Sequence, residues 1–245
     1  MTDQTGHSKS LNEMVGAHRA RITEMKEVSR LSEDEFETLR VVHPLTHNTE
    51  SLAQFNALVQ KLMLHGDGNN FAVAVTGLSR GVGVSYVALN IAAALAADYR
   101  RTSLLIQCNP YPSVLNRMME PYPDCGLMDY LDDPEMDIDD IVYSPGVARM
   151  RVMPYGDERI HSRLLAHDRM HDMLRAARSR YSDRFIVLDL PDVLDLGHAR
   201  SVLGWVDATV LVVPYGVSDR RAVRLGIDAV GQNRLAGLVM NRVPG

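Results

Sequence analysis

The sequence predicts a doubly wound α/β fold, in which helices cover both faces of a mostly parallel β-sheet. Three observations support this prediction. Short, almost wholly apolar runs recur along the chain, as expected for strands that are buried on both faces. These runs alternate with longer segments of helical periodicity. One run leads directly into a glycine-rich turn and a helix, an arrangement that binds phosphate groups. A helical or flexible N-terminal extension is expected to precede this fold.

Composition and charge narrow the class of protein. The chain has 245 residues, of which 46% are hydrophobic and 23% charged, and these ordinary values exclude collagen-like, coiled-coil and wholly disordered chains. A net charge of −5 argues against a nucleic-acid partner, and two cysteines in so long a chain suit a reducing compartment. The N-terminus is polar, and no apolar run approaches the roughly 20 residues of a membrane span. We therefore expect a cytoplasmic protein.

Residues 1–50 differ in character from residues 51–245, which we expect to form the α/β domain. Their first part predicts one amphipathic helix, because apolar residues recur every three or four positions: Leu11, Met14, Val15, Ile22, Met25 and Val28. A second short helix is expected after Ser32, which has capping-box spacing with Glu35. Residues 41–49 contain Pro44 and predict an extended linker. The extension is interpreted either as a surface segment or as a docking arm for a partner.

The elements of residues 51–245 alternate in the order that a parallel sheet requires. A helical stripe over residues 52–63 comes first. Strands are predicted at residues 71–76, 103–106, 150–153, 185–189, 208–213 and 236–240. Helices are predicted at residues 85–97, 163–179 and 219–232.

The glycine-rich turn matches a phosphate-binding loop only in part. The pattern asks for Gly, four residues, Gly, Lys and then Ser or Thr. Gly83 and Ser85 fill the last glycine and the hydroxyl, whereas Val84 stands where the lysine belongs. Loss of one such charge-assisted contact weakens binding by roughly 1.5–3 kcal/mol, and more in a transition state where charge develops. Arg80 either supplies this charge or is a solvated loop residue.

Further segments occur along the chain in a fixed order after this turn. They are Gly126–Leu131, Met153–Gly156, Tyr181–Pro191, Trp205–Val213 and Gly237–Val243. Together with Gly81–Ala92, they resemble the bacterial tyrosine kinases of the polysaccharide co-polymerase type, which are relatives of the MinD and ParA ATPases. The resemblance covers about residues 45–245. It implies a P-loop NTPase-like fold for the α/β domain.

The resemblance also implies a nucleotide site for ATP or ADP with magnesium. In such a site, Gly81 and Gly83 lie at the phosphates, while Ser85 and Asp189 hold the magnesium ion. Asn241 and Arg242 match the segment that contacts adenine. Simpler interpretations remain for Asp189, Asn241 and Arg242, because an Asp at a strand end and a polar pair after a strand are common turn residues.

The departures from the family pattern lie where its chemistry takes place. Besides Val84, the acidic pair that ends the second strand of these kinases reads Gln107 and Asn109 here. Amides cannot neutralise magnesium or act as a base near pH 7, so the implied ATP and magnesium are in doubt. Two arginines of the helix that assembles the family's ring fall on Ala53 and Asn56. The family's C-terminal tyrosine cluster has no counterpart in the sequence.

These replaced residues serve one function, so we interpret the chain as a pseudokinase. It is expected to be a non-catalytic or weakly active accessory protein of exopolysaccharide or capsule synthesis and export. The resemblance implies that it binds the cytoplasmic part of a membrane polysaccharide co-polymerase, is held at the inner membrane through that partner, and can form a homo-oligomer.

Two alternatives stay open for the function of the chain. One is an active ATP-dependent tyrosine autokinase or ATPase, in which Arg80 replaces the lysine. The other is a MinD/ParA-like nucleotide switch. The second alternative is weakened by Ser79, which stands at the extra loop lysine of that branch.

Two other patterns have simpler interpretations. His167 and His171 are four residues apart and suit zinc, but no third ligand is evident, so a surface helix is expected. The acidic run over residues 132–140 lacks the glycine and terminal glutamate of a calcium loop and is interpreted as solvated.

Overall fold

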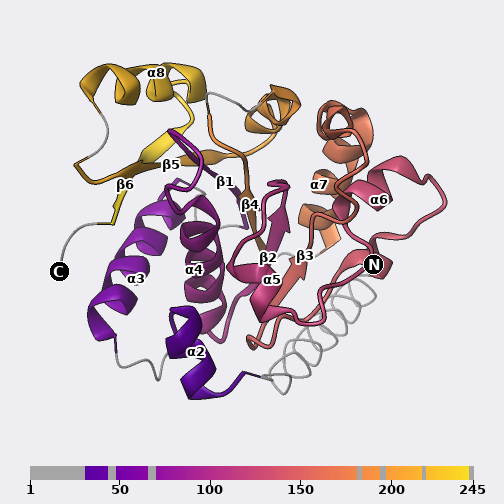
Figure 1. The fold of residues 1–245 in the computed structure, drawn as a ribbon, viewed down its shortest axis with the longest axis horizontal. Coiled ribbons are helices and arrows are strands. Elements are labelled where there is room, and N and C mark those ends of the chain that lie inside the picture. The colour runs from indigo at the N-terminus through magenta and orange to yellow at the C-terminus, as the bar shows by residue number, and fades with distance from the viewer. Residues whose placement is uncertain are drawn as a thin grey trace, which may run out of the picture.

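A single six-stranded parallel sheet forms the centre of the molecule in the computed structural model, which describes residues 31–43, 48–65, 70–180, 184–193, 197–216 and 219–242. The strand order is β3-β2-β4-β1-β5-β6, and every neighbouring pair is parallel (Figure 1). The strands are β1 Ala72–Gly77, β2 Thr102–Gln107, β3 Met150–Met153, β4 Arg184–Asp189, β5 Ala208–Pro214 and β6 Leu235–Asn241. The predicted doubly wound α/β fold is therefore confirmed, and each predicted strand is present.

Helices cover both faces of the sheet, as Figure 1 shows. One buried cluster lies beneath α2 (Glu33–Leu39), α3 (Thr49–Met63), α4 (Val84–Ala97) and α5 (Val114–Met118). The other lies beneath α6 (Leu127–Asp132), α7 (Asp168–Arg180) and α8 (Arg220–Val230), together with 3-10 helices at Ile138–Ile141, Ser162–Ala166 and Gly197–Gly204. Among the described residues, no helix has both the length and the apolar character to cross a bilayer.

The central helix α4 anchors the described part of the N-terminal extension. The buried Asn90 side chain accepts a hydrogen bond from the Val42 N–H at 2.7 Å and donates one to the Arg40 carbonyl at 3.2 Å. The predicted capping box of Ser32 and Glu35 is present at the start of α2. Residues 31–43 thus pack on the domain through polar and apolar contacts, while the helix predicted over residues 11–28 lies outside the described residues.

The prediction of one helix over residues 163–179 is wrong. A 3-10 helix ends at Ala166, His167 is extended, and α7 begins at Asp168. A histidine ring caps the start of each piece: His161 Nδ1 accepts from the Arg163 N–H at 3.0 Å, and His167 Nδ1 accepts from the Arg169 N–H at 3.3 Å. Capping by histidine leaves the apolar periodicity unbroken, and for that reason the sequence pattern did not reveal the boundary.

The histidine pair of the zinc alternative does not form a metal site with other ligands. The His167 ring caps α7, and the His171 ring packs against Trp205 with 5.3 Å between ring centroids. Within the described ranges, no three His, Cys, Asp or Glu side chains are grouped closely enough to hold a metal ion. His171 therefore lies on α7, whereas His167 precedes that helix.

Candidate functional site

The candidate site lies where the carboxyl ends of the central parallel strands meet. In open α/β sheets, ligands bind in the crevice outside these strand ends. Here β1, β2 and β4 are adjacent, and Asp189 at the end of β4 stands beside Val75 of β1 and Gln107 of β2. The turn from β1 into α4 lies at the same end of the sheet. The phosphate loop, Gln107 of β2 and Asp189 of β4 are therefore close to one another.

The phosphate loop, residues 78–83, has the backbone conformation that its glycines permit. Gly81 and Gly83 have φ angles of 80° and 95°, a left-handed region that favours glycine. Gly83 is the N-cap of α4 and contributes no side-chain cap. The first N–H groups of a helix lack intrahelical partners and carry partial positive charge. The end of the 14-residue helix α4 can therefore stabilise an anion.

Two side chains from the end of β6 hold the outer side of this loop. The Asn241 Nδ2 donates a hydrogen bond to the Val82 carbonyl at 2.8 Å, and the Arg242 guanidinium donates to the Gly81 carbonyl. The fit is tight, because a Cβ added to Gly83 would overlap Asn241 Nδ2. We call Asn241 and Arg242 the β6 latch. The sequence resemblance placed this pair at adenine, and in the structure both side chains contact the loop itself.

Val84 makes apolar contacts in place of the missing lysine. Its side chain is buried in the cluster beneath α4, and a Cβ added to Gly77 would lie only 2.7 Å from Val84 Cγ2. A branched side chain packed in this way carries neither charge nor donor to a phosphate. The backbone groups of the loop are thus present, while position 84 contributes no charge beside them.

Arg80, the predicted replacement for that cation, is stacked on an aromatic ring. Its guanidinium carbon lies 3.6 Å from the centroid of the Tyr111 ring, on the segment that follows β2. The Tyr111 N–H in turn donates to the Asn109 side-chain oxygen at 3.2 Å. A cation–π contact at an exposed site contributes about 0.5–1 kcal/mol, which is weak enough for Arg80 to leave.

Asp189 is a buried carboxyl group without a regular hydrogen bond. Its exposed fraction is 0%, and neither oxygen has a partner of normal geometry among the described residues. Burial raises the pKa of the Asp189 carboxyl to about 7, while the Ser85 hydroxyl and the Asn109 amide act in the opposite direction. An orphaned carboxylate and a facing hydroxyl are oxygen ligands that fit a hydrated magnesium ion.

The side chain of Gln107 is held by contacts within the protein. The Gln107 Oε1 accepts from the Tyr122 hydroxyl at 2.8 Å, and its Nε2 donates to the Asn109 carbonyl at 3.3 Å. The same hydroxyl accepts from the Tyr155 N–H at 3.3 Å. Both ends of the Gln107 amide are therefore used within the protein. No sequence motif marks this contact, because Tyr122 and Gln107 belong to different segments.

The structure brings most of the predicted site residues together. Loop residues Gly81 and Gly83 contact the β6 latch, and Ser85 faces Asp189. The counterparts of the family's ring-assembly residues are elsewhere, on the exposed face of α3: Glu50, Ala53 and Asn56.

Comparisons with known proteins agree with the predicted resemblance, although no family model matches the chain. The tyrosine-protein kinase Wzc of Salmonella typhi is 24% identical over 208 residues, which make up 84% of this chain and 28% of Wzc. The succinoglycan biosynthesis transport protein ExoP of Rhizobium meliloti is 26% identical over 182 residues, or 69% of this chain and 22% of ExoP. The chain thus spans about a quarter of the length of the curated relatives it matches.

Solved structures show the same fold. The kinase domain of VpsO superposes with a TM-score of 0.68 at 24% identity, over 79% of this chain and 95% of that domain. The kinase domain of the Escherichia coli tyrosine kinase ETK gives 0.66 at 21% identity, over 79% and 78%. A chain of the MinC:MinD cell division protein complex of Aquifex aeolicus gives 0.57 at 17% identity, over 71% of this chain and 69% of that chain. The predicted similarity to bacterial tyrosine kinases and to the ParA/MinD fold is confirmed.

Proposed function

We propose that this homologue of bacterial tyrosine kinases is a non-catalytic or weakly active accessory protein of exopolysaccharide or capsule synthesis and export. Its relatives include a protein named for succinoglycan biosynthesis and transport and proteins named tyrosine-protein kinase. These names support a role in polysaccharide biosynthesis. The non-catalytic part of the proposal rests on the site of this chain.

The observation that carries the proposal is the commitment of Gln107 to the scaffold. Its amide is hydrogen-bonded at both ends, so the position that is acidic in the kinases neither binds magnesium nor takes a proton. Val84 removes the loop cation as well. Phosphoryl transfer depends on electrostatic stabilisation of the transferring group, and both losses act on that step.

The remaining groups support nucleotide binding without turnover. When bound, magnesium would neutralise phosphate charge, with Ser85 and Asp189 as the residues that hold it. The phosphate loop and the end of α4 bind the phosphates through backbone N–H groups. ATP or ADP would then act as a ligand that orders the site rather than as a substrate.

The proposed partner is the cytoplasmic part of a membrane polysaccharide co-polymerase. Residues 1–50 would contribute to this contact as a docking arm, and the partner would hold the chain at the inner membrane. The support is the similarity to a region of longer polysaccharide proteins. No described contact identifies the partner.

A capture and deletion experiment tests this proposal. Co-polymerase cytoplasmic segments serve as bait for the full chain, with a chain lacking residues 1–50 as the matched comparison. Deletion of the gene should reduce polysaccharide, and both the natural chain and Asp189→Asn should restore it, because no turnover is needed. Failure of capture together with unchanged polysaccharide after deletion would refute the proposal.

An active autokinase or ATPase is the second candidate, favoured by the orphaned carboxyl of Asp189 facing Ser85. This candidate requires ATP turnover by the purified chain that Asp189→Ala abolishes. Turnover that survives the substitution would come from a contaminant, and the candidate would be rejected.

A further inference from the structure

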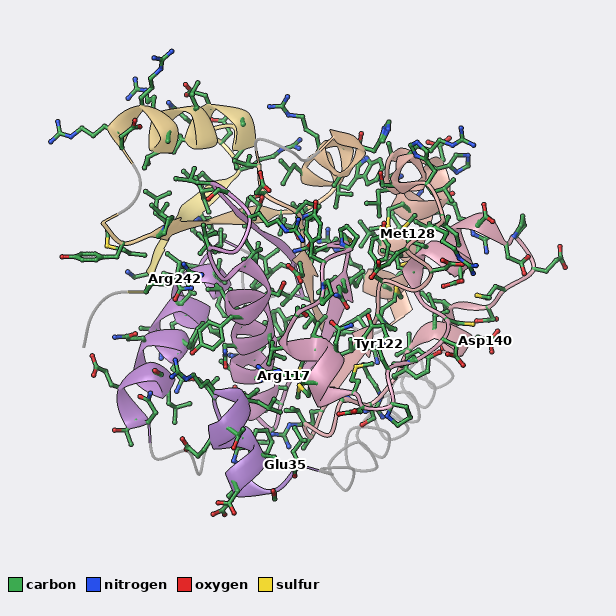
Figure 2. The ribbon with its side chains drawn as sticks, in the orientation of Figure 1. Glu35, Arg117, Tyr122, Met128, Asp140 and Arg242 are labelled. Atoms are coloured by element: carbon green, nitrogen blue, oxygen red, sulfur yellow. The ribbon has the colours of Figure 1, made fainter. Side chains whose placement is uncertain are left out.

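The outer face of α8 carries arginines without described partners. Arg220, Arg221 and Arg224 are exposed, and none of them forms an ion pair or hydrogen bond to any part of the chain that the structure describes. Figure 2 shows nitrogen-tipped side chains that extend from α8 away from the sheet. Asp228 is the single acidic residue within the helix. Together with Asp219, which caps the start of the helix, it leaves an excess of one positive charge over residues 219–230.

Uncovered apolar side chains lie on β6 beside this helix. Leu238 and Met240 are 48% and 58% exposed. They pair in register with Leu211 and Val213 of β5, which belong to the buried cluster beneath α8. Since register partners on adjacent strands share a sheet face, Leu238 and Met240 lie on the α8 side of the sheet. This edge of the sheet extends beyond the cover that α8 provides.

Two more apolar side chains border the same region. Leu225 of α8 is 50% exposed and lies one turn from Arg221, so both share one flank of the helix. Tyr215 is 48% exposed and follows β5, where its N–H donates to the Asn241 carbonyl at 2.8 Å. Exposed apolar groups therefore lie both on α8, beside its arginines, and on the neighbouring β6. We call Tyr215, Arg220, Arg221, Arg224, Leu225, Leu238 and Met240 the α8–β6 face.

The positive charge of this region stands out against an acidic chain. Three of the six arginines of residues 197–242 belong to the α8–β6 face, whereas residues 124–140 contain eight acidic residues and no basic one. The whole chain has a net charge of −5. A local excess of arginine on such a background orients the protein toward a negatively charged surface.

We propose that the α8–β6 face is a docking surface for an anionic lipid bilayer. Arginines near an anionic leaflet are attracted to its headgroups, and each contributes roughly a fivefold gain in binding. Leucine, methionine and tyrosine side chains of the face would insert into the boundary between headgroups and acyl chains. A fluid bilayer accommodates a convex helix without a matching partner surface. Nucleic acid would use the arginines but would leave the apolar side chains in water.

Vesicle binding by the full-length chain tests this proposal. The probes are vesicles of phosphatidylglycerol mixed with phosphatidylcholine, compared with phosphatidylcholine alone, at low and high salt. The test variant is Arg220→Gln/Arg221→Gln/Arg224→Gln. The matched control is Arg117→Gln/Arg163→Gln/Arg175→Gln, which removes three exposed arginines that belong neither to α8 nor to β6. Thermal unfolding of each variant verifies that it is folded.

The expected result is salt-sensitive binding to the anionic vesicles only. The triple α8 variant should bind roughly 100-fold more weakly, while the control variant binds like the natural chain. Leu238→Ser/Met240→Ser should weaken binding several-fold with the arginines intact. The proposal is overturned if the natural chain ignores anionic vesicles or if both triple variants bind alike. It is also overturned if the α8 substitutions abolish self-association or capture of an acidic protein and leave vesicle binding unchanged.

Discussion

The phosphate loop and the end of β2 lie side by side in this molecule, yet they differ in how closely each matches the pattern of the related kinases. The loop retains left-handed glycines, a free helix end and the β6 latch on its outer carbonyls. At the end of β2, Gln107 is instead tied to Tyr122 and to the backbone. Backbone geometry that can hold an anion thus lies beside a strand end whose Gln107 side chain is committed to contacts within the protein.

If the proposed function holds, nucleotide binding and turnover are separable in this chain. Anion binding at a helix end depends on main-chain groups, which any sequence supplies once the glycines are in place. Phosphoryl transfer depends on individual charged side chains. Substitutions at the loop should therefore affect structure and binding together, whereas substitutions at β2 should affect local packing.

The largest expected effect concerns Asp189, which lies between the two regions. Its pKa is about 7 in the folded chain and near 3.8 when exposed, so between these values the folded state binds the extra proton. Stability is thus lost as the pH rises from about 4 to 7 and is constant above. Asp189→Asn should remove this loss, a gain on the order of 3–4 kcal/mol at pH 8 relative to pH 4.

Denaturant unfolding of both proteins across this pH range measures the gain. Asp207→Asn is a suitable control for an added amide, because Asp207 is partly exposed and paired with Arg178. An equal effect of Asp189→Asn at pH 4 and pH 8 would show that the buried carboxyl does not titrate in this range.

The loop side of the comparison is tested by Gly83→Ala. An alanine would occupy a left-handed backbone position and would overlap Asn241 Nδ2, so we expect a loss of about 2–4 kcal/mol. Gly81→Ala is the matched control, because Gly81 has a similar φ but no atom within 4 Å of its added Cβ. It should lose only about 1 kcal/mol. Equal losses, measured by denaturant unfolding, would mean that the latch does not constrain the loop.

The β2 side is tested by Tyr122→Phe. The substitution removes the hydroxyl that donates to Gln107 and accepts from the Tyr155 N–H, which should cost about 1–2 kcal/mol. Tyr130→Phe is the control, since the Tyr130 ring contacts Arg169 but its hydroxyl has no described hydrogen bond. If the two variants unfold at the same denaturant concentration, the Tyr122 hydroxyl does not hold Gln107 through a stabilising hydrogen bond.

The smallest effect is expected where the two regions touch. Tyr111→Ala removes the ring on which Arg80 stacks and should lower stability by only about 0.5–1 kcal/mol. If Arg80 can serve the phosphates, release from the ring should strengthen ATP binding in calorimetric titration. Unchanged ATP affinity in Tyr111→Ala would show that Arg80 plays no part in binding.

Sequence patterns predicted the strands and most helices because parallel strands buried on both faces read as nearly continuous apolar runs. The loop glycines were predictable for a different reason, because a left-handed turn before a helix restricts the residue type to glycine. Contacts between distant segments were not predictable from local patterns. Tyr122 reaches Gln107 across 15 positions, and Asn241 reaches Val82 across 159. The divided helix at His167 was missed because its capping ring sits within an intact apolar stripe.

Calorimetric titration with ATP and magnesium, followed by measurement of phosphate release, tests most directly whether binding has been kept and turnover lost. We expect the natural chain to bind ATP without releasing phosphate. Val84→Lys should bind at least about tenfold more tightly, as expected for one restored charge-assisted contact, and should also release none. The absence of binding by both proteins would contradict a retained loop. Phosphate release by the natural chain that Asp189→Ala abolishes would contradict the loss of turnover.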